Sequence, residues 1–311
     1  MSKKLRIGTR GSQLALWQAN WVREQLENCY PDLEIEIETI KTTGDKILDV
    51  PLAKIGGKGL FVKEIEAALL ENTIDIAVHS MKDVPTELPV ELGIVVVTER
   101  EDPRDAVIGN KEIPILDLPA GSKIGTSSLR RQAQLLVSRP DFVLEPLRGN
   151  VNTRLRKLRE GMFDAIILAM AGVKRLGWEN KVTEVLDTHV MLPAIGQGAL
   201  GIEARLDDEA TIARILFLDH EATRFCVTAE RSFLHRLEGG CQVPVAAHGT
   251  MEENGIVLEG LVARINGEKV VRMSDRASAA DAAVLGTKLA DRILEAGGRE
   301  ILEELYCREL T

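Results

Sequence analysis

The stretch KIGTSSLRRQAQLLV, residues 123–137, joins a short apolar segment to an amphipathic one through three hydroxyl residues. Its first part predicts a β-strand over residues 123–126, and the leucines that recur on one face predict a helix over residues 128–137. The segment PLRGNVNTRL, residues 146–155, repeats this strand-to-helix junction one strand later. This order is typical of α/β folds, in which helices cover a parallel or mixed sheet.

The same alternation continues on both sides of this stretch. Ser12 is a suitable N-cap for a helix on which Leu14, Trp17 and Val22 recur at helical spacing, and a second N-terminal helix is expected over residues 61–70. Another helix is expected over residues 151–160. We expect strands over residues 5–9, 34–40, 75–79, 94–98, 106–108, 123–126, 142–147 and 163–168.

Two polar or proline-broken segments divide this alternation into two lobes. They are TEREDPRD, residues 98–105, and LPAIGQGALG, residues 192–201. Two lobes joined by two crossovers form a cleft, which is where ligands of α/β proteins usually bind.

The pattern changes after residue 219. A long amphipathic helix comes first, and strands are expected over residues 245–250, 256–263 and 269–273, with Asn266-Gly267 as a hairpin signal. The sequence therefore predicts a small α+β domain with a three-stranded antiparallel sheet. The expected domains are residues 1–99 with about 198–218, residues 100–197, and residues 219–311.

Composition sets the broad class of the protein. The chain has 311 residues, of which 45% are hydrophobic and 28% charged, so it is neither disordered nor of low complexity. No apolar run is long enough to span a bilayer, and no signal peptide is recognisable, so a cytoplasmic location is expected. The net charge of -9 argues against a general nucleic-acid-binding protein.

The acidic total conceals a basic segment. Residues 121–175 contain 11 basic and four acidic residues, a balance of +7, and most of the basic residues are arginines. Exposed helical faces account for Arg156, Lys157 and Arg159. The other arginines suit recognition of carboxylate or phosphate groups, for which the planar guanidinium is well shaped.

Polar residues directly follow the strand expected over residues 75–79. They are His79, Ser80, Lys82 and Asp83, and side chains at this end of a strand project into the crevice of an α/β sheet. Asp83 is a candidate to hold a cation or to accept N–H bonds, although it could simply cap the turn before Pro85. For His79, structural hydrogen bonds at the strand end are the alternative.

The two strand-to-helix junctions suit anions. Thr126, Ser127 and Ser128 add hydroxyls to the free N–H groups of a helix start, and Arg130 and Arg131 add positive charge. Arg148 and Arg154 repeat the arrangement at the second junction. Several anionic groups on one ligand are therefore indicated, as in a polycarboxylate or a polyphosphate.

The glycine-rich segment KIGGKGLF, residues 54–61, lacks the spacing of a phosphate-binding P-loop. It is better interpreted as a mobile flap over a cleft, formed by Lys54, Gly56, Gly57, Lys58 and Gly59. The glycines of residues 196–201 satisfy G-x-G-x-x-G, but Pro193 interrupts the strand that should precede them, so a dinucleotide fold is not favoured.

The four cysteines have neither disulfide nor metal-site spacing, and no metal site is expected. Cys226 fits the buried face of a helix. Cys241 lies between Gly240 and Gln242 at a domain junction, where its sulfur would be accessible. It is either structural, a nucleophile without a local base, or an attachment point for a bound group.

Eight motifs together resemble the porphobilinogen deaminase family over residues 6–305. They are RIGTRGSQLALWQ, TTGDK, GGKGLFVKEIE, AVHSMKDVPT, IGTSSLRRQAQL, LRGNVNTRL, LPAIGQGALGIE and GGCQVPVAA. The resemblance implies two lobes like those of type II periplasmic binding proteins and a small third domain that carries the cysteine on a loop.

The resemblance also implies a reaction. Enzymes of this family join four porphobilinogen molecules head to tail into hydroxymethylbilane and release one ammonia at each condensation. A dipyrromethane primer is attached to the family cysteine, which Cys241 matches, and Asp83 matches the catalytic aspartate. The residues matched to primer and substrate contacts are Arg10, Ser80, Lys82, Thr126, Ser127, Ser128, Arg130, Arg131, Arg148, Arg154 and Arg175.

The expected partner is porphobilinogen alone, without nucleic acid or membrane, and the expected state is a monomer. A two-lobed module that binds a small anion without chemistry is the alternative, because fold does not determine function.

Overall fold

The computed structural model describes residues 4–46, 59, 61–237 and 243–309. The chain divides into two compact units. Unit 1 comprises residues 1–101 and 199–224, and unit 2 comprises residues 102–198 and 225–311.

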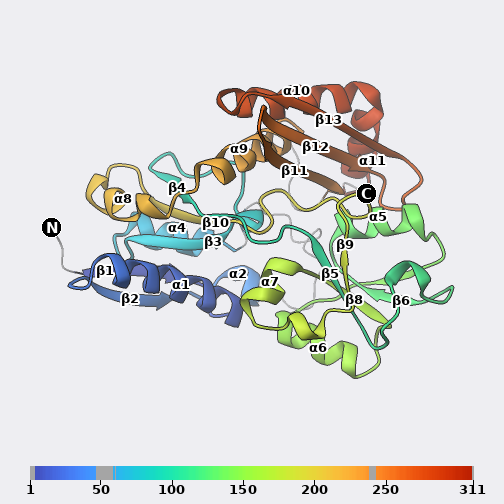
Figure 1. Cartoon of the computed structure of the whole chain (residues 1–311), viewed down its shortest axis with the longest axis horizontal. Helices are drawn as coiled ribbons and strands as arrows, with labels where there is room; N and C mark the ends of the chain where they lie inside the picture. Colours follow the sequence, from blue (N-terminus) through green and yellow to red (C-terminus); the bar gives the residue numbers. More distant parts are fainter. Residues whose placement is uncertain (1–3, 47–58, 60, 238–242, 310–311) are drawn as a thin grey trace. The chain divides into compact units, whose positions relative to one another are not determined.

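Unit 1 contains a five-stranded mixed sheet in the order β2-β1-β3-β10-β4 (Figure 1). The strands are β1 (Lys4–Thr9), β2 (Glu34–Thr39), β3 (Ile76–Ser80), β4 (Leu92–Val97) and β10 (Leu200–Arg205). β1 is parallel to β2 and β3, whereas β10 is antiparallel to β3 and β4. The chain returns from unit 2 at β10, so this strand fills a place between two strands that are made much earlier.

Helices cover both faces of this sheet. Alternate residues of β3 face opposite sides: Ile76 and Val78 pack in one core with α1 (Gln13–Cys29) and α8 (Glu209–Ile215), and Ala77 packs in another with α4 (Lys63–Leu70). The predicted cap is confirmed, because the Ser12 side chain accepts a hydrogen bond from the Ala15 backbone N–H. Unit 1 also contains the short helix α2 (Thr43–Lys46) and the turn η1 (Met81–Asp83).

Unit 2 contains a second five-stranded sheet, in the order β7-β6-β8-β5-β9. Its strands are β5 (Asp105–Gly109), β6 (Lys123–Gly125), β7 (Val143–Glu145), β8 (Ala165–Ala169) and β9 (Glu184–Leu186). The sheet has the same plan as that of unit 1. Three parallel strands lie side by side, and one antiparallel strand, β5, lies between them and the edge strand β9. The accompanying helices are α5 (Leu129–Ser138), α6 (Val151–Arg159) and α7 (Met170–Arg175).

The C-terminal part of unit 2 is a three-stranded antiparallel sheet, β11-β12-β13, with helices. Its strands are β11 (Val245–Glu252), β12 (Gly255–Ala263) and β13 (Val270–Ala277), and its helices are α9 (Glu221–Arg236), α10 (Ala282–Ile293) and α11 (Arg299–Glu309). Phe233 is fully buried at the centre of this core. α9 and α10 approach so closely that a Cβ on Gly286 would lie 2.1 Å from the Ala229 carbonyl oxygen, so only glycine fits there.

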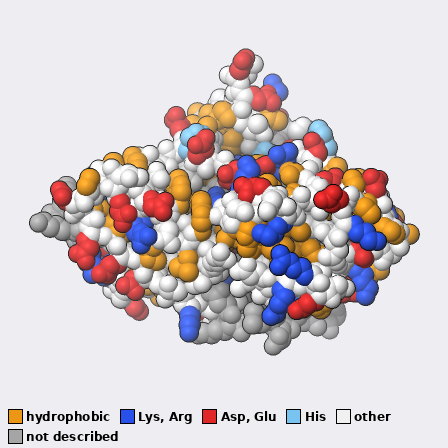
Figure 2. Space-filling view, turned by 60° about the horizontal axis from the view of Figure 1, so that its bottom comes forward, with side chains coloured by type: hydrophobic (Ala, Val, Ile, Leu, Met, Phe, Trp, Pro, Cys, Tyr) orange, Lys and Arg blue, Asp and Glu red, His pale blue; other side chains and the backbone are white. Residues whose placement is uncertain are grey.

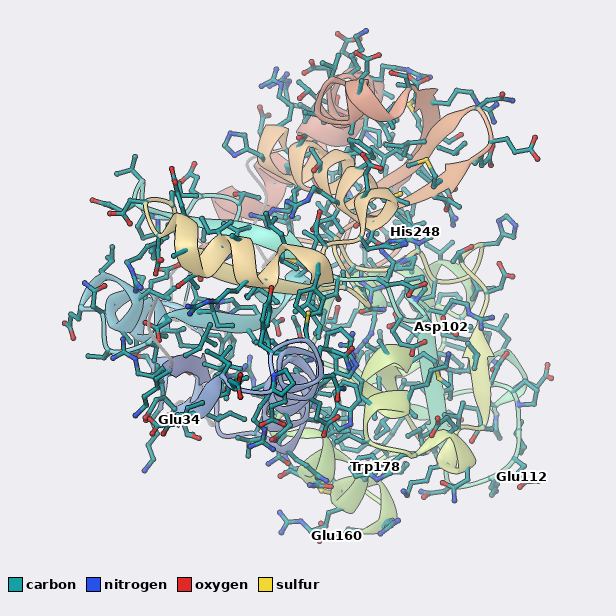
Figure 3. All side chains as sticks on the ribbon, turned by 60° about the vertical axis from the view of Figure 1, so that its left-hand side comes forward. Glu34, Asp102, Glu112, Glu160, Trp178 and His248 are labelled. Atoms are coloured by element: carbon teal, nitrogen blue, oxygen red, sulfur yellow. The ribbon has the colours of Figure 1, made fainter. Side chains whose placement is uncertain are left out.

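A buried carboxylate ties the segment before β10 to this C-terminal part. The two oxygens of Glu230 accept the backbone N–H groups of Gly196 and Gly249, each at 2.7 Å. The predicted hairpin is also confirmed: Gly267 has a φ of 76° in the turn between β12 and β13. Charged side chains such as Glu34 and Glu160 point outward (Figure 3), and acidic and basic groups are interspersed on the face drawn in Figure 2.

The predicted fold class is confirmed: two α/β sheets of the same plan and a small antiparallel sheet. The short elements α2, α7, α8 and β9 were not predicted, because each is too short to show a clear period. The three-domain division stays a prediction. In the described parts of the chain, no helix is both long and apolar enough to cross a membrane.

Candidate functional site

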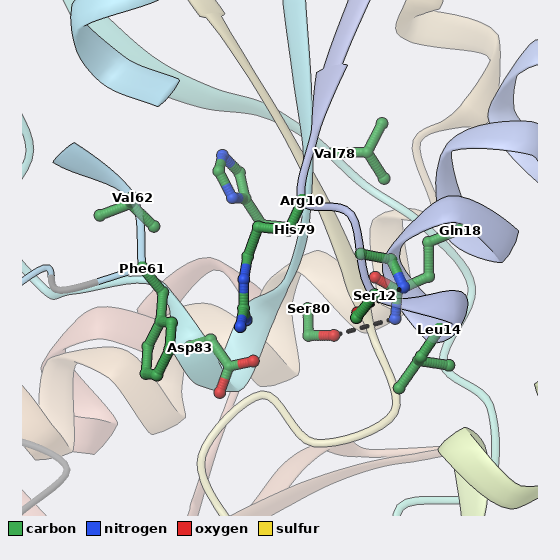
Figure 4. Close-up of a pocket in the computed structure, with 11 residues that line it drawn as sticks. Arg10, Ser12, Leu14, Gln18, Phe61, Val62, Val78, His79, Ser80 and Asp83 are labelled. Atoms are coloured by element: carbon green, nitrogen blue, oxygen red, sulfur yellow. Dashed lines mark hydrogen bonds between the residues drawn. The ribbon is translucent and has the colours of Figure 1, made fainter. Parts of the chain in front are cut away.

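A pocket lies in unit 1 where β1 and β3 end (Figure 4). β1 and β3 are parallel neighbours, with Ile7 opposite Ile76, so their carboxyl ends meet at one edge of the sheet. The lining residues are Arg10, Ser12, Leu14, Ala15, Gln18, Phe61, Val62, Val78, His79, Ser80 and Asp83. The structure therefore brings together three of the predicted site residues, Arg10, Ser80 and Asp83.

One wall of the pocket is a stack of a cation on an aromatic ring. The guanidinium carbon of Arg10 lies 4.3 Å from the centroid of the Phe61 ring, a cation–π arrangement. The ring also lies against Gly44, where an added Cβ would come within 2.2 Å of it. The TTGDK motif thus contributes a glycine that leaves room for the aromatic wall.

The pocket also carries acceptors. Asp83 ends the turn η1 and is exposed, and the turn itself is closed by the Val84 backbone N–H, which donates to the Met81 carbonyl. Ser80 accepts a hydrogen bond of 2.9 Å from the Gln18 amide (Figure 4). Lys82 lies on the same turn and is half-buried. A guanidinium and a carboxylate in one pocket suit a ligand that has both acid groups and N–H donors.

Arg130 and Arg131 lie in unit 2 in a buried network around Asp105. The two guanidinium groups are 2.7 and 2.8 Å from the two oxygens of Asp105, and all three side chains are buried. Arg130 also donates to the Leu192 carbonyl, and Arg131 to the Ile167 carbonyl. Burial alone would raise the pKa of Asp105, but the two guanidinium groups lower it well below its usual range.

The arginine network is charged but incompletely bonded. Asp105 neutralises one of the two positive charges, so the pair keeps a net charge of +1. The buried Nε of Arg131 has no hydrogen-bond partner among the residues that the structure describes. Asp105 could not be identified from the sequence, because nothing local distinguishes an aspartate that begins a buried strand from one that ends a loop.

The hydroxyl residues before α5 bond to their own turn and to the next one. Ser128 caps α5 by accepting from the Arg131 backbone N–H, and Thr126 Oγ1 accepts from the Ser128 N–H at 3.2 Å. Ser127 donates to the Leu147 carbonyl at 3.0 Å. The two predicted anion-binding junctions are therefore linked directly to each other.

The remaining predicted arginines lie on neighbouring segments of unit 2. Arg148 is half-buried between β7 and α6, and Arg154 donates to the Gly149 carbonyl at 2.9 Å. Arg175 ends α7 and donates to the Gly198 carbonyl at 2.6 Å. The predicted residues thus form one group in unit 1 and a second group in unit 2.

Several predicted residues lie outside the described residues. They are Cys241, Lys54, Gly56, Gly57 and Lys58. Gly59 is described, with a φ of 84° that favours glycine, and its carbonyl accepts the Val62 N–H just before α4. No set of three or more His, Cys, Asp or Glu side chains in the described parts of the chain is placed to hold a metal ion.

Comparison with known proteins covers almost the whole chain. The family "Porphobilinogen deaminase, dipyromethane cofactor binding domain" matches residues 5–213, and "Porphobilinogen deaminase, C-terminal domain" matches residues 224–295. The porphobilinogen deaminase of Trichlorobacter lovleyi is 60% identical over 99% of both chains. That of Geobacter sulfurreducens is 58% identical over 99% of this chain and 96% of the relative.

Among solved structures, the alkanesulfonate-binding protein of Xanthomonas axonopodis is 13% identical, covers 77% of both chains and has a TM-score of 0.40. The full-length matches at about 60% identity decide the relationship: the chain belongs to the porphobilinogen deaminase family.

Proposed function

We propose that the chain joins four porphobilinogen molecules head to tail into hydroxymethylbilane and releases one ammonia at each condensation. It is a transferase of tetrapyrrole biosynthesis, because its relatives of that function match it from end to end. The observation that carries the residue assignment is the pocket at the ends of β1 and β3, which Arg10 and Asp83 line together.

The described residues fit a dipyrromethane cofactor. Such a group carries pyrrole N–H donors and several carboxylates, so it needs an acceptor and a set of cations. The pocket of unit 1 offers the Asp83 carboxylate and the Arg10 guanidinium, and unit 2 offers a buried Arg131 Nε that has no partner among the described residues. When bound, the dipyrromethane supplies the pyrrole α-carbon to which the first substrate unit is joined.

Asp83 acts on the reacting pyrrole. Its carboxylate accepts pyrrole N–H groups and stabilises the positive charge that develops on the ring as ammonia leaves. It is exposed at the end of η1, where a substrate can reach it. Ser80 lies near it in the chain, and its hydroxyl oxygen accepts a hydrogen bond from Gln18 at the pocket wall.

Arginines hold the acid side chains of the substrate and of the growing chain. Arg10 stacks on Phe61, and a guanidinium group is well shaped to form paired hydrogen bonds with a carboxylate. The other proposed contacts are Lys82, Thr126, Ser127, Ser128, Arg130, Arg131, Arg148, Arg154 and Arg175. Of these, Arg130 and Arg131 are both held by the carboxylate of Asp105.

Cys241 is the proposed attachment point through a thioether, and Lys54 to Gly59 the proposed flap. Intact-protein mass spectrometry tests the attachment: the purified chain should exceed its sequence mass by one dipyrromethane, and Cys241→Ser should show the bare mass. A Cys241→Ser chain that carries the normal adduct would contradict the assignment. Cys29, which is exposed on α1, provides the matched control, because Cys29→Ser should keep the adduct.

The same preparation distinguishes the enzyme from a module that only binds a small anion, which the family relationship does not favour. The enzyme consumes porphobilinogen with release of ammonia and passes through chain masses that rise by successive pyrrole units. A chain of bare mass that binds porphobilinogen without consuming it would contradict the proposal. A monomeric state and a cytoplasmic location belong to this proposal as well.

A further inference from the structure

One polar side chain of the pocket wall comes from the buried face of a helix. Gln18 on α1 is only 2% exposed and lines the pocket. The other buried residues of α1 are Ala19, Val22 and Leu26, which belong to an apolar core of unit 1. An amide costs free energy at such a position unless its hydrogen bonds are made, whereas an apolar side chain has no such cost. Packing alone therefore does not account for an amide at this position.

The amide makes a specific contact with a predicted site residue. Nε2 of Gln18 donates a hydrogen bond of 2.9 Å to Oγ of Ser80, and both residues line the pocket (Figure 4). The bond joins α1 to the end of β3, and its two residues are 62 positions apart in the sequence. The bonding of the Ser80 hydroxyl is thus set by a residue of another element.

Both partners are held in place by the fold of unit 1. α1 is fixed at its start, where Ser12 caps it by accepting a hydrogen bond from the Ala15 backbone N–H. β3 is paired on one side with β1 and on the other with β10, and Ser80 itself lies opposite Leu200 of β10. The geometry of the bond between Gln18 and Ser80 therefore does not depend on a ligand.

The contact determines which way the Ser80 hydroxyl can bond. A hydroxyl has one hydrogen and two lone pairs, whereas an amide NH₂ group is a donor only. Gln18 therefore occupies a lone pair of Ser80, and the hydroxyl hydrogen points away from the amide. In the described parts of the chain, no acceptor bonds this hydrogen, and Ser80 is half-buried on the pocket wall. The hydrogen is thus available to a bound ligand.

A hydroxyl that donates distinguishes between the polar groups of the proposed substrate. Porphobilinogen carries acetate and propionate carboxylates, which only accept, and pyrrole and aminomethyl N–H groups, which donate. Arg10 and Ser80 are then donors suited to a carboxylate, and Asp83 is an acceptor suited to the N–H groups. Donors and an acceptor in one pocket select the orientation of the ring as well as bind it.

We propose that Gln18 is a positioning residue that keeps the Ser80 hydroxyl a hydrogen-bond donor, and that Ser80 donates to one carboxylate of the porphobilinogen molecule that reacts in this pocket. The inference rests on the proposed function, in which Asp83 binds the N–H groups of the same ring. No bond is made or broken at Gln18 or Ser80, so the two residues affect how the substrate binds. Their effect is therefore expected on KM.

Gln18→Met tests the positioning role, because it removes the amide and keeps the length of the side chain. The Ser80 hydroxyl then loses its fixed polarity. KM for porphobilinogen should rise about three- to tenfold, with kcat changed by less than about twofold. Ser80→Ala should raise KM by at least as much, and the double variant should be no worse than Ser80→Ala, because Gln18 acts through Ser80. A purely structural role of Gln18 would instead add its own loss in the double variant.

Asn20→Leu is the matched control. Asn20 lies on the same helix, its amide donates to the Leu16 carbonyl at 2.7 Å, and it is not among the described residues that line the pocket. Its loss should leave KM unchanged. Intact-protein mass spectrometry accompanies each variant, because all of them should carry the normal adduct. A Gln18 or Ser80 variant without the adduct would place the contact on the primer and overturn its assignment to porphobilinogen.

Inhibition constants identify the group that Ser80 binds. The probes are two pyrroles, one lacking the acetate and the other lacking the propionate of porphobilinogen, used as competitive inhibitors. Ser80→Ala should weaken the binding of the analogue that keeps the contacted carboxylate and leave the other unchanged. A loss with both analogues, or with neither, would mean that Ser80 does not donate to a substrate carboxylate.

The inference can be overturned without the Gln18 variant. If Gln18→Met does not fold, an unchanged KM in a folded Ser80→Ala chain still contradicts the proposed contact. The wild-type chain decides the proposed function separately. A wild-type chain that does not consume porphobilinogen would end both proposals, whereas an active wild-type chain with unaffected variants would refute only the roles of Gln18 and Ser80.

Discussion

Arg10 in unit 1 and the pair Arg130 and Arg131 in unit 2 carry the same charged group in different surroundings. Arg10 lines a pocket and stacks on Phe61, whereas the paired arginines are buried and share the carboxylate of Asp105. The number of arginines in a sequence therefore overstates the positive charge offered to a ligand. Asp105 neutralises one of the two positive charges, and it also holds the two guanidinium groups in one geometry.

The largest expected effect concerns the pocket. Asp83→Ala should lower kcat on the order of 100- to 1,000-fold, because a carboxylate that stabilises developing charge is lost. The thermal midpoint should stay the same, since Asp83 is exposed and the turn is closed by backbone atoms. Product formation and thermal unfolding measure the two effects. Asp32→Ala, an exposed aspartate in the loop between α1 and β2, is the control, and near-normal turnover of Asp83→Ala would remove Asp83 from the site.

The second prediction concerns the arginine network. Asp105→Asn leaves two buried guanidinium groups without their shared counter-charge, so the free energy of unfolding should fall by about 3 kcal/mol. Urea unfolding measures this loss. Asp141→Asn provides the comparison in the same unit, because the Arg139–Asp141 pair has a similar N···O distance of 2.6 Å but is exposed, so its loss should change the unfolding midpoint little. Equal effects of the two substitutions would break the distinction between buried and exposed pairs.

The third prediction contrasts two buried carboxylates whose pKa values move in opposite directions. The lowered pKa of Asp105 means that its contribution to stability is present above the unfolded value of 3.8 and is lost as the pH falls toward the folded value. The raised pKa of Glu66 means the reverse: its contribution is full below the unfolded value of 4.5 and is lost as the pH rises through the folded value.

Urea midpoints measured against pH separate the two carboxylates. Asp105→Asn should weaken the loss of stability in acid, and Glu66→Gln should weaken the loss of stability as the pH rises above about 4.5. If both substitutions changed the stability on the same side of the pH range, the opposite directions of the two pKa shifts would be wrong.

The smallest effect is expected at the aromatic wall of the pocket. Phe61→Leu removes the ring under the Arg10 guanidinium, and a cation–π contact is worth about 0.5–1 kcal/mol at exposed sites. KM for porphobilinogen should therefore rise about two- to fivefold with a smaller change in kcat. Steady-state kinetics measures both constants. Phe217→Leu, at a partly exposed position outside the pocket, should leave both unchanged.

Features that depend on neighbouring residues were predictable from the sequence. Ser12 caps α1, Gly267 lies in a hairpin turn, and Ser80 and Asp83 follow β3 into the pocket, because caps, turns and strand ends are set by local chemistry. Of the polar residues expected at the end of β3, His79, Ser80 and Asp83 line the pocket with Arg10, since parallel neighbouring strands end at the same edge.

Features that join distant segments were not predictable. Asp105 reaches Arg130 and Arg131 across the sheet of unit 2, and Glu203 reaches His79 from 124 residues away. An antiparallel strand inserted into a mostly parallel sheet leaves no local signal of its neighbours. His79 does form the structural hydrogen bond that was considered for it, but no sequence pattern identifies Glu203 as the partner.

The place of β10 has a consequence for synthesis on the ribosome. β3 and β4 leave the ribosome more than a hundred residues before the strand that belongs between them, because β10 begins only at residue 200. At about 5–20 residues per second, the nascent sheet waits on the order of 5–20 s with two unpaired edges, which are sites of aggregation. The first third of the chain to be translated thus depends on a strand translated much later for a complete sheet.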